Sequence, residues 1–147
     1  MIPELDAEGL LPEGVHEAHL WEVRERFGRF SESDQRIRLQ EKLERFLEEA
    51  ESSELGLIFY VDGSFVTAKS EPSDVDLILE LPDGHDWAAE LRPAQYNVLS
   101  KRRVKARHGL DVLAAPGGSE ALQGYIDFFS QVRGRPGLRK GILKVRR

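Results

Sequence analysis

The stretch VDGSFVTAKSEPSDVDLILEL, residues 61–81, places two carboxylates, Asp74 and Asp76, inside an apolar run. A carboxylate that is buried without a positive partner is costly or shifts its pKa until it is neutral, so a purely structural strand avoids such residues. Because side chains alternate across a strand, the two aspartates are predicted to share one face while Val75 and Leu77 point into the core. We therefore expect a positive group, such as a metal ion, beside the two aspartates.

Upstream of this stretch, residues 1–15 are expected to form an irregular lead-in and residues 16–54 to be helical. Apolar residues recur at helical spacing in two segments, and the first segment ends at Gly28. The second segment is predicted to be a long amphipathic helix with Ser31 or Ser33 as its N-cap. Its apolar face comprises Ile37, Leu39, Leu43, Phe46, Leu47 and Ala50.

Downstream, short apolar runs bounded by turn residues alternate with helical patterns. The runs predict three strands, at 55–61, 75–81 and 110–115. The helical patterns predict one helix at 93–107, beginning at Pro93, and another at 119–132, capped by Ser119. The tail GILKVRR is a candidate last strand. We therefore expect an α/β (α+β) fold in which a small mixed sheet packs on helices.

The length of 147 residues suits a single domain with its own core. Within it we expect the catalytic core at residues 55–115, followed by a helix and a basic tail at residues 119–147. The composition, 40% hydrophobic and 32% charged, is typical of a globular chain. The absence of cysteine excludes a disulfide framework, a thiolate metal site and a cysteine nucleophile.

The first residues are acidic and broken by proline, unlike the basic start and apolar centre of a signal peptide. No apolar run approaches the ~20 residues that a membrane span needs. We therefore expect a cytoplasmic protein that does not enter the membrane.

The net charge of −5 conceals two strongly basic segments, residues 101–108 and 133–147. A run of charges is commonly a solvated surface. Such a density of lysine and arginine can also attract a triphosphate or a nucleic acid, although no aromatic residues are interleaved for base stacking in residues 101–108. The sequence leaves both interpretations open.

The paired aspartates suit a divalent cation. Mg²⁺ prefers hard oxygen ligands and is commonly held by one or two carboxylates together with water and substrate phosphates, which fits Asp74 and Asp76. Asp111, flanked by apolar residues in the third predicted strand, could supply a third carboxylate, and three acids would let two metal ions flank a reacting phosphate. Gly63 and Ser64 lie where the first strand ends, so their N–H groups and the serine hydroxyl could bind phosphate oxygens.

The order of these motifs resembles that of the DNA polymerase beta-like nucleotidyltransferase superfamily. In that order a strand is followed by Gly-Ser, then by about a dozen residues, then by an Asp-x-Asp between apolar residues and by a later single Asp. A small group of uncharacterised bacterial proteins assigned to that superfamily looks similar over GSFVTAKSEPSDVDLILEL, LLPEGVHEAHLWEVRERFG and FFSQVRGRPGLRKGIL. The resemblance implies transfer of a nucleoside monophosphate from a nucleoside triphosphate to a hydroxyl of a protein or RNA acceptor, with release of pyrophosphate. It implies Mg²⁺ or Mn²⁺ as the cofactor.

The resemblance also implies roles for individual residues. Asp74 and Asp76 would be metal ligands. Asp111 would be the third acid, which completes the metal site and assists the acceptor hydroxyl. Gly63 and Ser64 would bind the nucleotide phosphates.

The chain departs from the superfamily pattern in two ways. Minimal nucleotidyltransferases of the toxin-antitoxin type usually carry an arginine a few residues after Gly-Ser, whereas this chain has Lys69, which can bind phosphate as a point cation but not as a bidentate fork. The chain also lacks a large acceptor-binding lobe. Activity therefore either needs a partner protein or has been lost.

Other interpretations of the same residues stay open. The chain could be a non-catalytic interaction subunit, such as one half of a toxin-antitoxin-like pair, or a sugar-nucleotide transferase that uses Asp-x-Asp to bind a diphosphate. Asp111 could be an edge acid or a helix cap, and Asp62 could cap the turn or face away from the site. No metal-ligand spacing links the histidines, which are expected at the surface: His16, His19, His85 and His108.

Overall fold

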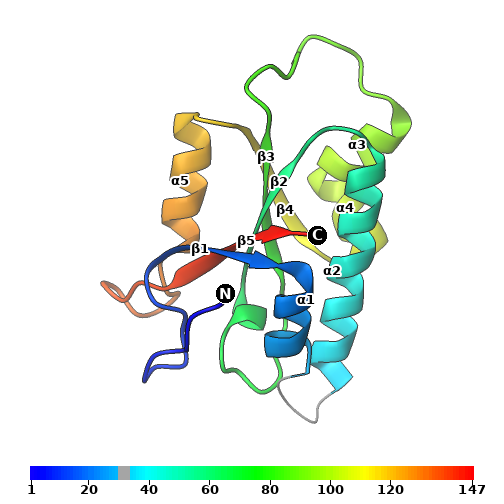
Figure 1. Cartoon of the computed structure of the whole chain (residues 1–147). Helices are drawn as coiled ribbons and strands as arrows, with labels where there is room; N and C mark the ends of the chain where they lie inside the picture. The colour runs from blue at the N-terminus through cyan, green and yellow to red at the C-terminus, as the bar shows by residue number, and fades with distance from the viewer. Residues whose placement is uncertain (30–33) are drawn as a thin grey trace.

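Figure 1 shows the computed structural model of the chain, which describes residues 1–29 and 34–147. Within these residues, one sheet contains the strands β1 (Gly14–His19), β2 (Ile58–Asp62), β3 (Asp76–Leu81), β4 (Asp111–Pro116) and β5 (Gly141–Arg146). Their order across the sheet is β1-β5-β2-β3-β4. β1 runs parallel to β5 and β3 runs parallel to β4, whereas β2 is antiparallel to both of its neighbours.

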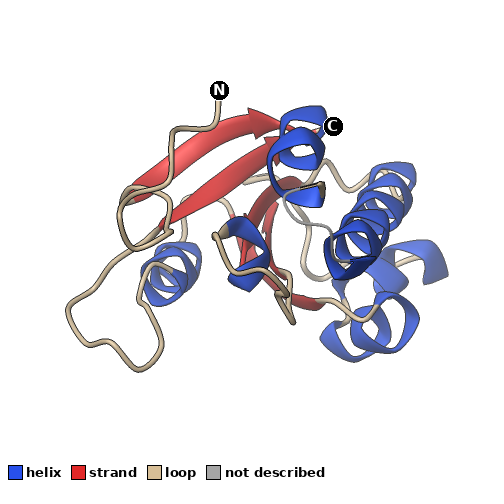
Figure 2. Ribbon diagram, turned by 90° about the horizontal axis from the view of Figure 1, so that it is seen from below, coloured by secondary structure: helices blue, strands red, loops and turns tan. Residues whose placement is uncertain are grey.

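Helices cover both faces of this mixed sheet (Figures 1 and 2). They are α1 (Leu20–Val23), its π-helical continuation η1 (Arg24–Gly28), α2 (Asp34–Ser52), the short 3₁₀-helix η2 (Ser64–Val66), α3 (Pro93–Leu99), α4 (Lys101–His108) and α5 (Glu120–Phe129). The helices α1 to α4 share one hydrophobic cluster with the sheet, and α5 packs on the opposite face, against β3 and β4. The predicted α/β (α+β) fold, a small mixed sheet packed on helices, is confirmed.

The alternation of side chains along each strand divides the core into two parts. Val61 and Leu77 point to the larger cluster, which contains the apolar face of α2. Their chain neighbours Tyr60 and Ile78 point to the smaller cluster beneath α5. The same alternation decides on which face of the sheet the acidic residues at the strand ends lie.

Most predicted elements occur close to their predicted positions. The three predicted strands correspond to β2, β3 and β4, and the tail GILKVRR forms β5. Ser119 caps α5 as predicted, since its hydroxyl accepts a hydrogen bond of 3.1 Å from the N–H of Leu122. The predicted helix at 93–107 is two helices, because Ser100 is extended and its hydroxyl caps α4 by accepting a hydrogen bond from the N–H of Arg103.

The prediction of a helix starting at residue 16 is wrong, because β1 extends from Gly14 to His19. Among the side chains of β1 only Ala18 is buried, so this edge strand lacks the alternating apolar pattern by which a strand is identified. Its pairing partner, β5, lies at the other end of the chain. Ile37 is 47% exposed and therefore does not belong to the buried face of α2, contrary to the prediction.

The prediction that all four histidines lie at the surface is wrong for His108. Its buried ring packs edge-on against Phe46, with 5.4 Å between ring centroids, and its Nε2 lies 2.9 Å from Glu49 Oε2. These contacts fix the end of α4 against α2. The predicted helix caps Ser31 and Ser33 lie outside the described residues. Of the helices in the described ranges, none combines the length and the hydropathy needed to cross a membrane.

A buried arginine in α2 fixes the loop that follows β2. Arg36 is 0% exposed and donates hydrogen bonds to main-chain carbonyls of two other segments. The acceptors are the carbonyl oxygens of Phe27 at 3.0 Å, Phe65 at 2.7 Å, Thr67 at 2.7 Å and Lys69 at 2.5 Å. Burial lowers the pKa of Arg36 to about 10, so the guanidinium remains protonated at neutral pH. It thereby holds residues 65–69 against α2 and η1.

Replacing Arg36 by methionine would leave these carbonyls without their donors. Each buried group that loses its partner costs about 1–3 kcal/mol, so we expect Arg36→Met to lower the free energy of unfolding by more than about 3 kcal/mol. Urea denaturation followed by circular dichroism measures this change. Arg38→Met removes an exposed arginine of the same helix, 3.9 Å from Asp34, and is expected to cost less than about 1 kcal/mol. Equal losses in the two variants would contradict the role assigned to Arg36.

Candidate functional site

A cleft of about 1030 Å³ opens where β2 ends and β3 begins. One wall carries Asp62, the Gly63–Ser64 turn, Asp74 and Asp76. The other wall is the segment that leaves α5 and returns to the sheet at β5, residues 128–140. Gly63, Ser64, Asp74, Asp76 and Lys69, which were all predicted as site residues, therefore line one cleft.

Three carboxylates form a row across the strands at this edge of the sheet. Asp62 of β2 lies opposite Asp76 of β3, and Asp76 lies beside Asp111 of β4. Residues in register on adjacent strands point to the same face, here the face that carries α5. Asp62, which the sequence left unexplained, thus belongs to the acidic row.

The Gly63–Ser64 turn is docked onto Asp74. Asp74 Oδ1 accepts hydrogen bonds from the Ser64 N–H at 2.8 Å and from the Ser64 hydroxyl at 2.7 Å. Gly63 has a φ of 92°, and a Cβ at this position would lie 2.9 Å from the carbonyl oxygen of Asp74, so the turn requires glycine. The sequence led us to expect the Ser64 donors to point at a phosphate, whereas in this structure they point at Asp74.

The two aspartates of the Asp-x-Asp motif have opposite pKa shifts. Burial acts to raise the pKa of Asp74, but the hydrogen bonds from Ser64 and the positive charges nearby lower it below its ordinary value. Burial and the negative charges of Asp74 and Asp111 raise the pKa of Asp76 to about 6. A cation between them would relieve the repulsion that raises the pKa of Asp76.

Asp62 is the most buried acid of the row and has a lysine beside it. Its side chain is 4% exposed, and Lys140 Nζ lies 3.2 Å from its Oδ1, close enough for an ion pair although the two groups are not aligned as a hydrogen bond. Burial raises the pKa of Asp62 to about 7, and the charge of Lys140 opposes this rise. Lys140 immediately precedes β5, and sequence analysis placed it only within a basic tail.

Asp111, the predicted third acid, has a different environment. It is the partner of Asp76 in the strand register, but its Oδ2 lies 3.2 Å from Lys105 Nζ and it does not line the cleft. Across residues 1–29 and 34–147, no three carboxylate or imidazole side chains are grouped so that they could hold a metal ion. The donor set fits a cation held by Asp74 and Asp76 together with substrate phosphates and water.

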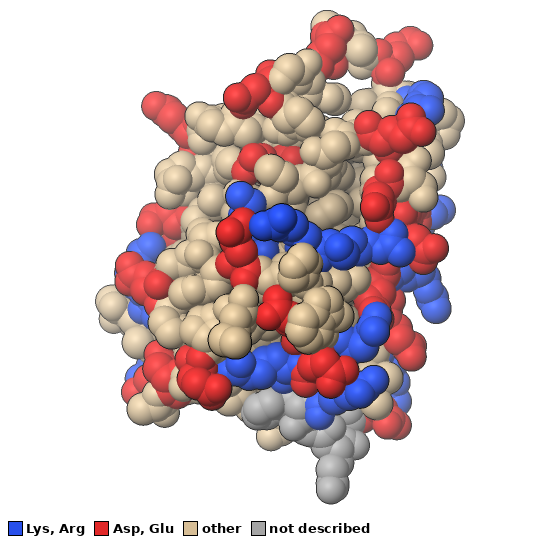
Figure 3. All heavy atoms as spheres, viewed as in Figure 1, with Lys and Arg blue, Asp and Glu red and all other residues tan. Residues whose placement is uncertain are grey.

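The two basic segments of the sequence lie in different places. Residues 101–108 form α4, in which Arg103 stacks 4.8 Å from the ring centroid of Tyr96 and Arg107 pairs with Glu49 at 2.8 Å. α4 does not line the cleft, whereas residues 133–140 do. Figure 3 shows acidic and basic side chains interspersed on the face displayed there rather than separated into patches of one sign.

The raised pKa of Asp76 leads to a prediction about stability in metal-free buffer. The folded-state pKa of about 6 exceeds the ordinary aspartate value of 3.8, so the contribution of Asp76 to stability is present at low pH and is lost as the pH rises through about 6. The Asp76→Asn variant does not lose stability in this way, because asparagine does not titrate. We therefore expect its stability relative to wild type to increase between about pH 4 and pH 6 and then level off. Denaturant titrations across this range measure the difference, and parallel pH curves for the two proteins would contradict the prediction.

Comparison with known proteins assigns the chain to a protein family. No curated protein and no solved structure matches the chain. A model of one protein family matches residues 3–146, almost the whole length. The chain belongs to that family, DUF6932, which is described as a family of unknown function.

Proposed function

We propose that the protein is a Mg²⁺-dependent or Mn²⁺-dependent nucleotidyltransferase, which moves a nucleoside monophosphate from a nucleoside triphosphate to a hydroxyl of a protein or RNA acceptor. The observation that carries this proposal is the docking of Ser64 on Asp74 beside Asp76, at the mouth of a cleft that also contains cationic side chains. A pair of carboxylates facing lysines and arginines suits a ligand that is itself a metal–polyphosphate complex. Without a cation, the negative charge of Asp74 raises the pKa of Asp76, so a bound metal ion would remove a repulsion that the fold leaves in place.

In this proposal Asp74 and Asp76 hold the metal ion. When bound, the ion would neutralise charge on the triphosphate and on the pyrophosphate that leaves. Other residues of the chain would hold these two carboxylates in place. Gly63 allows the turn to approach Asp74 closely, and Ser64 fixes the orientation of Asp74. Arg36 fixes the loop that follows Ser64. Lys69, exposed at the rim of the cleft, would add positive charge near the phosphates.

Asp111 would act on the acceptor. The acceptor oxygen attacks the α-phosphorus, the bond from that phosphorus to the pyrophosphate oxygen breaks, and the acceptor proton passes to a base. Asp111 neighbours Asp76 on the adjacent strand and is partly exposed, which suits this role once its pairing with Lys105 is exchanged for the acceptor. A cytoplasmic location belongs to the same proposal and is supported by a chain without cysteine.

A second candidate is a non-catalytic interaction subunit with the same fold, as in one half of a toxin-antitoxin-like pair. The pairing of Asp111 with Lys105 favours it, because a third acid engaged in an ion pair is not free to assist an acceptor hydroxyl. In the described residues no three carboxylate or imidazole side chains are close enough together to hold one metal ion, which points in the same direction. A protein that binds nucleotide without turning it over would fit this candidate.

Calorimetric titration of ATP, GTP, CTP and UTP tests the proposal. We expect at least one nucleotide to bind in the presence of Mg²⁺, and Asp74→Asn to weaken this metal-dependent binding by about tenfold or more, since a ligand carboxylate is lost. Asp83→Asn, which removes an exposed aspartate outside the cleft, is the matched control and should bind as wild type does. Metal-dependent binding that is unchanged in Asp74→Asn would contradict the assignment of the site.

Turnover separates the two candidate functions. The enzyme should release pyrophosphate from the nucleotide that binds and should label an RNA or protein acceptor from a cell extract with the nucleotide's α-phosphate. Metal-dependent binding with neither pyrophosphate release nor label transfer would favour the interaction subunit.

A further inference from the structure

Lys140 and Asp62 form an ion pair in the cleft that the proposed mechanism does not use. The Lys140 side chain is 14% exposed and the Asp62 side chain 4% exposed. Two charges withdrawn from water to this degree are commonly no more stable than a pair of apolar side chains of the same volume. The position of the pair in the cleft wall points to a role in ligand binding.

Lys140 is held in place by the fold. Its N–H donates to the carbonyl of Ser130 at 2.8 Å, and the next N–H, that of Gly141, donates to the carbonyl of Leu11 at 2.9 Å. β5 then continues between β1 and β2 in the interior of the sheet. With its main chain fixed in this way, Lys140 extends its ammonium to the acidic row. Its positive charge acts to lower the pKa of Asp62 and also those of Asp74 and Asp76.

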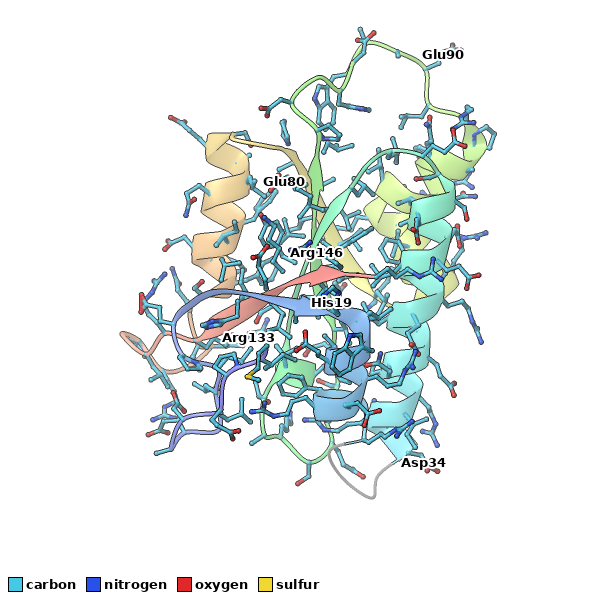
Figure 4. All side chains as sticks on the ribbon, in the orientation of Figure 1. His19, Asp34, Glu80, Glu90, Arg133 and Arg146 are labelled. Atoms are coloured by element: carbon cyan, nitrogen blue, oxygen red, sulfur yellow. The ribbon has the colours of Figure 1, made fainter. Side chains whose placement is uncertain are left out.

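Two of the other cations of the same wall are already paired with carboxylates. Arg135 pairs with Glu8 at 2.8 Å, and Arg139 pairs with Asp127 at 2.8 Å and Glu13 at 3.3 Å. Arg133 is exposed; Figure 4 shows it below α5, where the chain turns back toward β5. The charge of Arg133 also acts on the pKa of Asp76. Lys140 differs from these arginines because it is largely buried beside Asp62 and its main chain is fixed by hydrogen bonds.

The turn that was expected to bind phosphate cannot do so unaided. Both donors of Ser64, its N–H and its hydroxyl, are directed at Asp74 Oδ1. A polyphosphate that enters the cleft therefore needs positive charge from another part of the chain. Lys140 stands next to the same aspartates and can supply it.

We propose that Lys140 binds the polyphosphate of the nucleotide and that Asp62 is a positioning residue that holds the lysine in the cleft. The inference deepens the proposed function and rests on it, because it names the group that meets the phosphates of the substrate. When the ligand enters, the ammonium keeps Asp62 on one side and donates to a phosphate oxygen with its remaining hydrogens, since a lysine has three donors. Charge-assisted hydrogen bonds of this kind are among the stronger polar contacts in proteins.

A purely structural role for Lys140 makes a different prediction. If the lysine served only to neutralise Asp62, then removing both charges together would leave ligand binding unchanged. The double variant Asp62→Asn, Lys140→Met has the same net charge as the wild type and contains no unpaired buried charge. It therefore separates the loss of a phosphate contact from a change in the overall field or from misfolding.

Calorimetric titration of inorganic tripolyphosphate without metal tests the inference on the full chain. The proteins are the wild type, Lys140→Met, the double variant and Lys144→Met. The last variant removes a lysine of β5, the strand that follows Lys140, and Lys144 does not line the cleft. Thermal unfolding of each protein checks that it is folded before the titration.

We expect Lys140→Met and the double variant to bind tripolyphosphate about tenfold or more weakly than wild type, as for the loss of one hydrogen bond between charged groups. Lys144→Met should bind as wild type does. Wild-type affinity in the double variant would overturn the inference, and so would a wild type that binds no tripolyphosphate.

The two proposals can fail separately. Tripolyphosphate is titrated without metal, so its dependence on Lys140 does not involve metal binding by Asp74. If Asp74→Asn leaves metal-dependent nucleotide binding intact while Lys140→Met abolishes tripolyphosphate binding, the metal site is wrong and the phosphate contact stands. If Asp74→Asn weakens metal-dependent nucleotide binding while Lys140→Met and the double variant bind tripolyphosphate as wild type does, the metal site stands and the phosphate contact of Lys140 is wrong.

Discussion

The hydrogen bonds of the Arg36 guanidinium to main-chain carbonyls connect the helical layer to the site. They join α2 to η1 and to the loop that begins with Ser64. Because the acceptors are main-chain atoms, these hydrogen bonds do not require particular side chains in the loop. The buried side chains of Phe65 and Val66 add packing against the core. Ser64 is thereby placed against Asp74, and Asp74 is placed at the mouth of the cleft. The arginine that the chain lacks after Gly-Ser is not replaced by Arg36, since this guanidinium is buried and does not line the cleft.

The acidic row, Asp62, Asp76 and Asp111, places like charges next to one another, which costs the fold stability. Neighbouring carboxylates on adjacent strands repel one another, and burial adds to the cost, as the raised pKa values of Asp62 and Asp76 show. Lys140 offsets part of this cost beside Asp62. Asp74, which lies next to the row, is stabilised separately by its hydrogen bonds from Ser64. Residues that break a local rule of stability in this way are expected at functional sites, where a ligand completes the balance of charge.

The sequence predicted those features that depend on local pattern. Short apolar runs identified β2, β3 and β4, because each strand contributes buried residues to both faces of the sheet and is bounded by turn residues. The spacing of Asp74 and Asp76 with respect to Gly63 predicted that these residues lie together, and they line one cleft, since strand alternation and turn chemistry act over a few residues. The docking of Ser64 on Asp74 was not predicted, because the direction of a hydroxyl depends on the fold of the whole loop.

Features that depend on pairing across the chain were not predicted. β1 has one buried side chain and becomes a strand only because β5 lies beside it. Asp62 is the last residue of β2, and nothing nearby in the sequence shows that Asp76 will lie opposite it. Lys140 was grouped with a basic tail for the same reason, although the tail enters the middle of the sheet.

The placement of β5 explains how a cleft arises in so short a chain. β2 and β3 deliver the acids to one edge of the sheet, and β5 is antiparallel to β2, so the chain must enter β5 at that same edge. The segment between α5 and β5 is therefore forced to pass the acidic row, and its cations form the second wall of the cleft. A wall made by the entry to an interior strand is anchored by the main-chain hydrogen bonds of the sheet, which hold Lys140 more firmly than a free surface loop would. The topology of the sheet thus places a fixed cation opposite the carboxylates.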